Sequence, residues 1–309
     1  MVSIRVCIAI ALVFAGAGRA AGAESGNLAS GGFDRTFTVE APEHPDPSRP
    51  LPLVLVLHGA GGNGANALAA YRWDEAARRE NFIAAAPDAM PALVDQPASF
   101  MFNPRYWNDG SARGPEAHMR VDDATFLGTL IDQIARKYPV DRHRVYVTGF
   151  SSGASMTHRA GLVLADRLAA IAPVAGKSWT PTTPSRAVPV LYVVGDSDPL
   201  TPLAGGPVKL PWGGKVDTYP PARELPETWA KLDHCQAPVS EHPSPALSLE
   251  AWRHCGGDAE VLFYTIASLG HEWAGGRGRT LPASMTGPYS DAVDTTRLIW
   301  DFFLRHRLE

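Results

Sequence analysis

One short stretch decides the fold of this chain: RVYVTGFSSGASM, residues 144–156. Its apolar start predicts a buried strand, its end suits a helix, and Ser151 stands at the turn between them. Glycines at 149 and 153 let strand and helix approach where a β-carbon would clash. Such a turn holds the serine in a rarely allowed conformation and exposes its hydroxyl, as a nucleophile requires. A Gly/Ser turn without chemistry is the alternative, because Gly-x-Ser-x-Gly alone is only moderately specific.

Strand-like and helix-like segments alternate along the rest of the chain. Residues 53–57, LVLVL, form a continuous apolar run, which is typical of a strand buried on both faces of a parallel sheet. The alternation predicts an α/β fold with a mainly parallel central sheet and helices on both faces. We expect strands at 33–39, 53–57, 82–86, 144–148, 169–174, 188–194 and 261–266, and helices at 66–80, 122–138, 154–165, 224–232 and 291–305.

The first 23 residues have the pattern of an export signal. Arg5 supplies a positive charge, residues 6–17 are apolar, and Ala21-Gly22-Ala23 is a small-residue cleavage site. The apolar run is too short to span a bilayer. We therefore expect residues 1–23 to be removed and residues 24–309 to form one secreted catalytic domain, extracellular or periplasmic. An uncleaved N-terminal anchor is the alternative.

Composition argues against several classes of partner. Loss of Arg5 and Arg19 with the signal would move the formal net charge from −4 to −6, and no basic stripe indicates a nucleic-acid partner. No later segment is apolar enough for a membrane, and no His/Cys/Asp cluster has metal-ligand spacing, so neither a metal nor a cofactor is expected. Oligomeric state is left open. Cys235 and Cys255 form an even pair, which predicts a disulfide just before the candidate histidine; two free thiols are the alternative.

Ser151 needs a base and an acid to become a nucleophile at neutral pH. Asp198 and His271 each follow a predicted strand, and the order serine, acid, histidine is the one expected of α/β hydrolases. Asp196 shares the loop of Asp198, but it lies closer to the strand and suits a turn cap. Because Asp198 precedes Pro199, it is biased toward an extended conformation, and we expect it to be the acid.

Acyl transfer also needs donors for a developing oxyanion. The backbone N–H of Ser152 opens the helix after the nucleophile, and the glycine-rich turn after His58 offers a second donor, expected at Ala60. The competing interpretation is a phosphate-binding loop. It fails because no Gly-Lys-Ser/Thr follows and no complete Gly-x-Gly-x-x-Gly opens the next helix.

With these residues assembled, the sequence resembles the secreted polyhydroxybutyrate depolymerase and feruloyl esterase families of α/β-hydrolase serine esterases. The resemblance covers most of residues 33–305. It rests on LHGAGG at 57–62, WN at 107–108, VDD at 121–123, the nucleophile segment at 145–156, APVAG at 172–176, GDSDP at 195–199 and GHEWAGG at 270–276.

This resemblance implies that Ser151 is the nucleophile, Asp198 the acid, His271 the base, and Ala60 and Ser152 the oxyanion donors. The paired cysteines also resemble the family's disulfide. Polymer-degrading members often append a polymer-binding domain, whereas this chain ends soon after its last predicted helix. This difference argues against attack on crystalline polyester. The expected substrates are hydroxyalkanoate oligomers or polyester and feruloyl-type plant-wall esters.

The leading hypothesis is a secreted serine esterase acting on small-molecule or polymeric esters. Trp107, Trp212 and Trp273 lie on or near predicted rim loops, and we expect them to stack on an aromatic acyl group or a polymer chain; ordinary packing is the alternative. A peptidase on the same fold would be supported by a propeller or cap, which the sequence does not indicate. A catalytically inactive binding protein would be marked by a missing triad member.

Overall fold

The structure is a computed structural model that describes all residues except 1–22, 113–117, 119, 181, 211–215 and 278–280. In the described part of the chain a ten-stranded sheet runs in the order β1-β2-β4-β3-β7-β8-β9-β14-β13-β12. Neighbours from β4 to β14 pair in parallel, and the strands beyond them at both edges pair antiparallel. The strands are β1 (Glu24–Ser30), β2 (Phe33–Glu40), β3 (Leu51–Leu57), β4 (Ile83–Pro87), β7 (Val140–Phe150), β8 (Ala170–Val174), β9 (Val190–Gly195), β12 (Val239–Ser244), β13 (Leu247–Trp252) and β14 (Val261–Ile266).

All seven expected strands are present, and three strands of the main sheet were missed. β1 and β12 are mostly exposed strands at the two edges of the sheet, so they lack a buried apolar pattern. β13 does carry a signal, because Leu247, Leu249 and Ala251 alternate with polar residues. No element was assigned from the sequence between residues 232 and 261, so this strand was overlooked.

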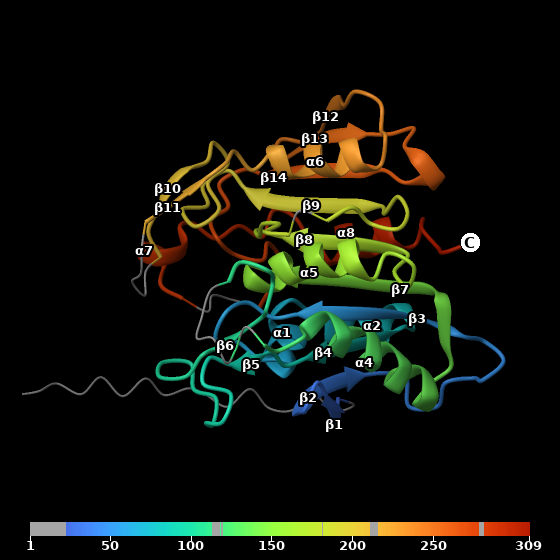
Figure 1. The fold of residues 1–309 in the computed structure, drawn as a ribbon. Coiled ribbons are helices and arrows are strands. Elements are labelled where there is room, and N and C mark those ends of the chain that lie inside the picture. Colours follow the sequence, from blue (N-terminus) through green and yellow to red (C-terminus); the bar gives the residue numbers. More distant parts are fainter. Residues whose placement is uncertain (1–22, 113–117, 119, 181, 211–215, 278–280) are drawn as a thin grey trace, which may run out of the picture.

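Helices cover both faces of the sheet, as expected (Figure 1). One face carries α4 (Asp123–Lys137), α5 (Ser152–Val163) and α6 (Glu224–Leu232), and the other carries α1 (Gly64–Ala70), α2 (Trp73–Glu80) and α8 (Thr295–Phe303). Two short elements lie in connections: a 3₁₀ turn, η1 (Gly256–Asp258), and α7 (Ala283–Thr286).

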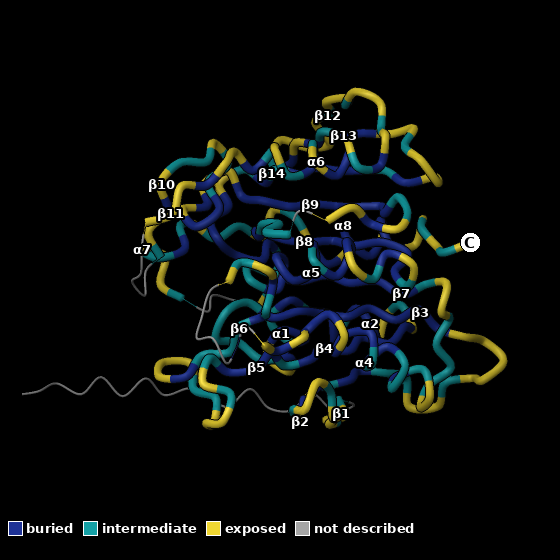
Figure 2. The backbone as a smooth tube through the Cα atoms, in the orientation of Figure 1, coloured by how far each residue is buried: buried dark blue, intermediate teal, exposed yellow. Residues whose placement is uncertain are grey.

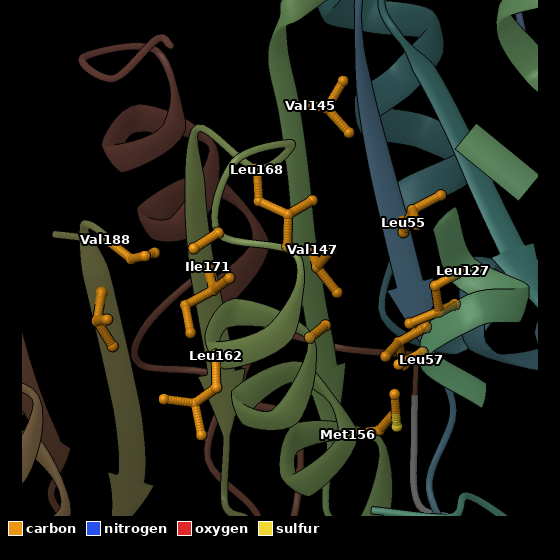
Figure 3. Packing of buried hydrophobic residues seen from close by; sticks show 14 of the residues in the cluster. Leu55, Leu57, Leu127, Val145, Val147, Met156, Leu162, Leu168, Ile171 and Val188 are labelled. Carbon is orange, nitrogen blue, oxygen red and sulfur yellow. The ribbon is translucent and has the colours of Figure 1, made fainter. Parts of the chain in front are cut away.

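The central strands feed two separate apolar cores. Every residue of β3 is buried, with Leu53, Leu55 and Leu57 on the side of α4 and α5 and Val54 and Val56 on the opposite side. Figure 3 shows the first core, in which side chains from neighbouring strands meet those of α4 and α5. Because successive side chains of a strand point to opposite faces, a continuous apolar run is what a sheet covered on both sides requires.

The helix expected at 66–80 is in fact two helices, which corrects the prediction. α1 ends at Tyr71, and Arg72 adopts a left-handed backbone conformation (φ 63°) before α2 begins. The Tyr71 ring stacks on Trp273 at 4.5 Å, and its hydroxyl hydrogen-bonds the backbone of Gly59. These contacts with distant segments turn the chain at a point where the local helical pattern continues.

The carboxyl ends of the parallel strands meet at one edge of the sheet, at the left of Figure 1. Two small antiparallel ribbons also lie at this edge: β5 (Met90–Pro91) with β6 (Arg105–Tyr106), and β10 (Gly206–Val208) with β11 (Asp217–Tyr219). Ligand sites in open parallel sheets form beyond this edge.

Candidate active site

Ser151 sits at a strained turn between β7 and α5. Its backbone angles, φ 56° and ψ −117°, lie outside the regions that residues with a side chain normally adopt. A β-carbon at Gly149 would lie 2.5 Å from the carbonyl oxygen of Gly153, and one at Gly153 would lie 2.3 Å from that of Leu57. Both glycines are therefore required by close backbone approach, as the sequence predicted.

A continuous chain of hydrogen bonds joins Ser151, His271 and Asp198. His271 Nε2 lies 2.9 Å from Ser151 Oγ, and His271 Nδ1 lies 2.8 Å from Asp198 Oδ2. The other carboxylate oxygen of Asp198 accepts backbone N–H groups of Leu200 at 2.7 Å and Thr201 at 2.8 Å. Asp198 is 3 % exposed and His271 6 % exposed, so these bonds are shielded from water. The three residues chosen from the sequence are thus brought together in the order that a nucleophile, its base and an orienting acid require.

Asp196 has a different task from its neighbour two residues on. It is exposed, and its Oδ1 accepts hydrogen bonds from the backbone N–H of Ser268 and the hydroxyl of Ser197, both at 2.8 Å. It therefore ties the loop after β9 to the loop after β14 that carries His271.

The histidine loop is held in place by backbone contacts and by a buried glutamate. His271 N–H donates to Thr286 O at 2.5 Å, and the Thr286 hydroxyl donates to Glu272 Oε1 at 2.7 Å. A β-carbon at Gly270 would lie 2.1 Å from Thr286 O, so only glycine fits beside this segment. Sequence reasoning missed Thr286, because α7 carries no motif that links it to the histidine, and it assigned no role to Glu272, although Glu272 directly follows His271.

His58 controls the turn that carries Ala60. The ring accepts the Ala89 N–H at Nε2 (3.0 Å), so Nδ1 carries the proton and donates to the Gly59 carbonyl at 2.7 Å. Burial lowers the pKa of His58 to about 4, so the imidazole ring stays neutral at neutral pH. Gly62 N–H also donates to the Gly59 carbonyl, at 3.0 Å. Because the Gly59 C=O and the Ala60 N–H point in opposite directions across one trans peptide plane, anchoring the carbonyl fixes the direction of the N–H.

Ala60 and Ser152 line one cavity together with Ser151 and His271. Among the residues that the structure describes, no group accepts a hydrogen bond from the backbone N–H of either one. Ser152 is the first residue of α5, where a backbone N–H lacks an intrahelical partner and the helix dipole favours negative charge. Both N–H groups are therefore available to an oxygen bound in the cavity.

The cavity has a volume of about 400 Å³ and largely apolar walls. Lys177 contributes a positive charge, and its ammonium lies over the rings of Trp179, at 4.7 Å, and Tyr219. The aromatic residues that line the cavity are Tyr106, Trp107, Trp179 and Tyr219. All but Trp107 were missed, because Trp179 stands in an irregular segment and Tyr106 and Tyr219 stand in strands of only two and three residues, too short for a periodic pattern.

The three tryptophans expected at the rim have different environments. Trp107 lines the cavity, is 3 % exposed, and donates its Nε1–H to the His58 carbonyl at 2.8 Å. Trp273 does not line it; the ring is 4 % exposed, stacks on Tyr71 and donates to Thr296 Oγ1 at 3.0 Å, so it is a packing residue. Trp212 lies outside the described residues.

A buried ion pair supports the loop that carries Trp107. Asp123 Oδ1 pairs with Arg35 at 2.6 Å, and Oδ2 accepts the backbone N–H of Asn108 at 2.7 Å. Asp122 caps α4 by accepting the Thr125 N–H at 3.0 Å. Asp122 therefore caps a helix and Asp123 supports the loop of Trp107.

Cys235 and Cys255 are joined by a disulfide, as expected. Its place differs from the expectation, because Cys255 precedes the start of β14 whereas His271 follows the end of that strand. The bond therefore joins the segment after α6 to the segment just before β14, at the amino ends of the parallel strands. It does not restrain the histidine loop, which lies at their carboxyl ends.

The described residues contain neither a metal-ligand cluster nor a membrane-spanning helix. Among them, no three His, Cys, Asp or Glu side chains lie close enough to hold a metal ion together. None of the helices in that part of the chain combines the length and the apolar character needed to cross a bilayer.

The sequence of this chain matches a known protein family. Residues 36–208, more than half of the chain, match the family described as "Phospholipase/Carboxylesterase". The chain belongs to this phospholipase/carboxylesterase family. It is 29% identical over 289 residues to the "Putative esterase NocK" of Nocardia uniformis subsp. tsuyamanensis, covering 84% of this chain and 78% of that protein.

Relatives that match a shorter part of the chain, and a solved structure, are also esterases by name. The chain is 31% identical over 167 residues to "Feruloyl esterase B" of Piromyces equi, which covers 51% of this chain and only 30% of that protein. The structure of an acetyl xylan esterase from Aspergillus awamori superposes with a TM-score of 0.58 at 14% identity, covering 91% of this chain and 98% of that one; this likeness concerns the fold alone. This member of the phospholipase/carboxylesterase family is therefore a carboxylic-ester hydrolase with an α/β-hydrolase fold.

Proposed function

We propose that the chain is a secreted serine esterase that forms an acyl-enzyme on Ser151. The observation that carries this proposal is the series of hydrogen bonds from Ser151 through His271 to Asp198, beside a cavity lined by Ala60 and Ser152, whose backbone N–H groups have no acceptor among the described residues. The proposed role of each of these three residues follows from its place in this series of hydrogen bonds. Ser151 Oγ faces the cavity, His271 is the base in contact with it, and Asp198 orients the base.

In the first half-reaction Ser151 Oγ attacks the ester carbonyl while His271 Nε2 takes its proton. The carbonyl oxygen becomes an oxyanion and accepts hydrogen bonds from the N–H groups of Ala60 and Ser152. A donor of this kind contributes about 3–4 kcal/mol to the transition state in related chemistry. The ester C–O bond then breaks, and the alcohol leaves with the proton returned by His271.

In the second half-reaction water takes the place of the alcohol. His271 Nε2 removes its proton as the oxygen attacks the acyl carbon, the same two N–H groups hold the oxyanion, and Ser151 leaves with the proton from His271. Asp198 keeps Nδ1 protonated throughout, because its carboxylate accepts that N–H and is itself held by two backbone N–H groups. A carboxylic acid and an alcohol are the products.

The cavity supports an apolar or aromatic acyl group. Trp107, Trp179 and Tyr219 line the same cavity as Ser151, and aromatic rings favour contact with apolar and aromatic groups. Hydroxyalkanoate oligomers, aliphatic polyester and feruloyl-type plant-wall esters are therefore the substrates proposed.

Export to an oxidising compartment is part of the proposal. Removal of residues 1–23 would leave Glu24, the first residue of β1, whose register with β2 begins at the pair Glu24 and Val39. Cleavage there keeps the edge strand whole. The disulfide between Cys235 and Cys255 is of a kind that persists outside the cytosol.

A panel of esters tests the proposed function and ranks the substrates. Purified protein is assayed on p-nitrophenyl esters of increasing chain length, methyl ferulate and hydroxybutyrate oligomers, with Ser151→Ala as the blank. We expect turnover of at least one class with a loss on the order of 10³-fold or more in the variant. Equal rates for the two proteins would contradict the proposal.

A further inference from the structure

Exposed apolar side chains are concentrated in one loop beside the cavity. In the described part of the chain eight large apolar side chains are exposed, and four of them lie in the loop at 92–104 between β5 and β6. Phe102 is 89 % exposed, Met101 75 % and Phe100 50 %; these three residues are called the apolar tip below. Figure 2 shows exposed segments of the β5–β6 region projecting from the body of the molecule at the lower left. A contiguous exposed apolar surface of this kind is typical of an interaction site.

The apolar tip is carried by a well-fastened loop. Asn103 is 4 % exposed and works as an internal clamp, because its Oδ1 accepts Leu93 N–H at 2.8 Å and its Nδ2 donates to the carbonyls of Leu93, Gln96 and Pro97 at 3.0–3.1 Å. Its backbone also exchanges two hydrogen bonds with Ser99, at 2.9 and 3.0 Å. The buried amide holds the loop in a shape that leaves the tip in water.

The tip is continuous with the cavity. Ala92 and Pro104, at the two ends of the loop, line the cavity that contains Ser151. The Phe100 ring packs on the turn of the expected oxyanion donor, since a β-carbon at Gly61 would lie 2.8 Å from it. A ligand seated on the tip would therefore lie beside the entrance through which an ester reaches Ser151.

The low charge of the loop favours an uncharged apolar surface over an anionic lipid surface as its partner. Between Met90 and Pro104 the only charged residue is Asp95, and the sequence has no lysine or arginine there. Binding to anionic lipid surfaces depends on basic residues near the apolar anchor, which this loop lacks. An uncharged apolar surface made of esters meets no electrostatic penalty and carries the group that the cavity accepts.

We propose that the apolar tip docks the protein on the surface of a water-insoluble aliphatic polyester, so that chains of that surface enter the cavity beside it. This inference rests on the proposed function and narrows its substrate class. Docking raises the local concentration of ester at Ser151, and it makes no contact with the reacting atoms. Loss of the tip therefore lowers hydrolysis of the solid and leaves hydrolysis of a small soluble ester unchanged.

Adsorption to a film of poly(3-hydroxybutyrate) tests the proposal independently of catalysis. The parent is Ser151→Ala, which cannot erode the film, and the test protein adds Met101→Ser and Phe102→Ser. Both positions are largely exposed, so folding should be retained, and melting temperatures check this. The matched control adds Leu304→Ser instead, an apolar residue 53 % exposed in the turn after α8. We expect adsorption to weaken about tenfold or more for the tip variant and not for the control.

Each other outcome has a defined meaning. Equal adsorption of the tip variant and the parent overturns the proposal, as does stronger binding of the parent to phosphatidylcholine vesicles than to the film. With Ser151 present, hydrolysis of p-nitrophenyl butyrate separates docking from chemistry. Absence of that hydrolysis alongside tip-dependent adsorption would remove the proposed esterase mechanism and leave the docking surface standing.

Discussion

The carboxylate of Asp196 accepts a hydrogen bond from the backbone N–H of Ser268, at 2.8 Å, and thereby joins the loop after β9 to the loop that carries His271. Two residues further on, Asp198 contacts the imidazole itself. One loop thus holds two acids with separate tasks, one structural and one in direct contact with the base.

Substitution by asparagine separates these tasks. Asp198→Asn should lower kcat by about 10³- to 10⁴-fold, because the amide favours the wrong imidazole tautomer. Asp196→Asn keeps an oxygen that can accept the Ser268 N–H, so its kcat should fall by less than about tenfold. Steady-state kinetics on one soluble ester measures both. If Asp196→Asn were the crippled variant, the assignment of the acid would be wrong.

His58 should affect kcat more than KM. His58→Ala removes the ring that anchors the Gly59 carbonyl and so lets the Ala60 N–H turn away from the cavity, which we expect to cost about 10²-fold in kcat. His58→Asn keeps a donor near the position of Nδ1 and should recover part of that loss. Kinetics well below each variant's melting temperature gives the comparison. A raised KM with unchanged kcat would assign His58 to substrate binding instead.

Removal of the disulfide should lower stability and spare the chemistry. The bond closes a segment with a sequence separation of 20, which corresponds to about 3 kcal/mol of loop entropy. For a chain of this size the paired change Cys235→Ser and Cys255→Ser should lower Tm by about 5–10 °C. Since the bond lies at the opposite edge of the sheet from His271, kcat/KM at low temperature should stay within about twofold of wild type. A large loss of kcat/KM before any unfolding would show that the histidine loop depends on this bond.

Asp233 makes stability depend on pH with a known sign. Burial raises its pKa to about 7 from the ordinary 3.8, and its Oδ1 accepts the Val188 N–H. Between about pH 4 and 7 the folded state therefore keeps a proton that the unfolded state loses. The contribution of Asp233 to the free energy of unfolding is fully present below about pH 4 and is lost as pH rises toward 7. Asp233→Asn keeps the acceptor and cannot ionise. It should match wild type near pH 4 and exceed its stability by about 2–4 kcal/mol above pH 7.

Chemical denaturation at several pH values measures the difference, with Asp258→Asn as an exposed control in η1. A constant difference between Asp233→Asn and wild type across this range would contradict the inferred titration.

Much of the fold was predictable because its signals are local. The buried strands are short apolar runs, and the turn at Ser151 has its glycines within two residues on each side. The catalytic candidates could be found because each directly follows such a strand. The order serine, acid, histidine then indicated that Ser151, Asp198 and His271 act together, although they lie far apart in the sequence.

The features that were missed depend on contacts between distant segments. The break at Arg72 follows from the stacking of Tyr71 on Trp273, about two hundred residues away in the chain. The same stacking buries Trp273, which the sequence alone could not distinguish from a rim residue. Trp179 reaches the cavity from an irregular segment and Tyr219 from the three-residue strand β11, and neither segment has a periodicity that indicates the direction of a side chain.

Covalent trapping determines whether Ser151 is the nucleophile. The protein is incubated with a p-nitrophenyl alkylphosphonate, which mimics the tetrahedral intermediate, and the adduct is located by tandem mass spectrometry. We expect one phosphonyl group per chain on Ser151, with release of p-nitrophenol, and none in Ser151→Ala or in heat-denatured protein. An adduct on Ser152 or another residue, or an unlabelled protein that still hydrolyses esters, would contradict it.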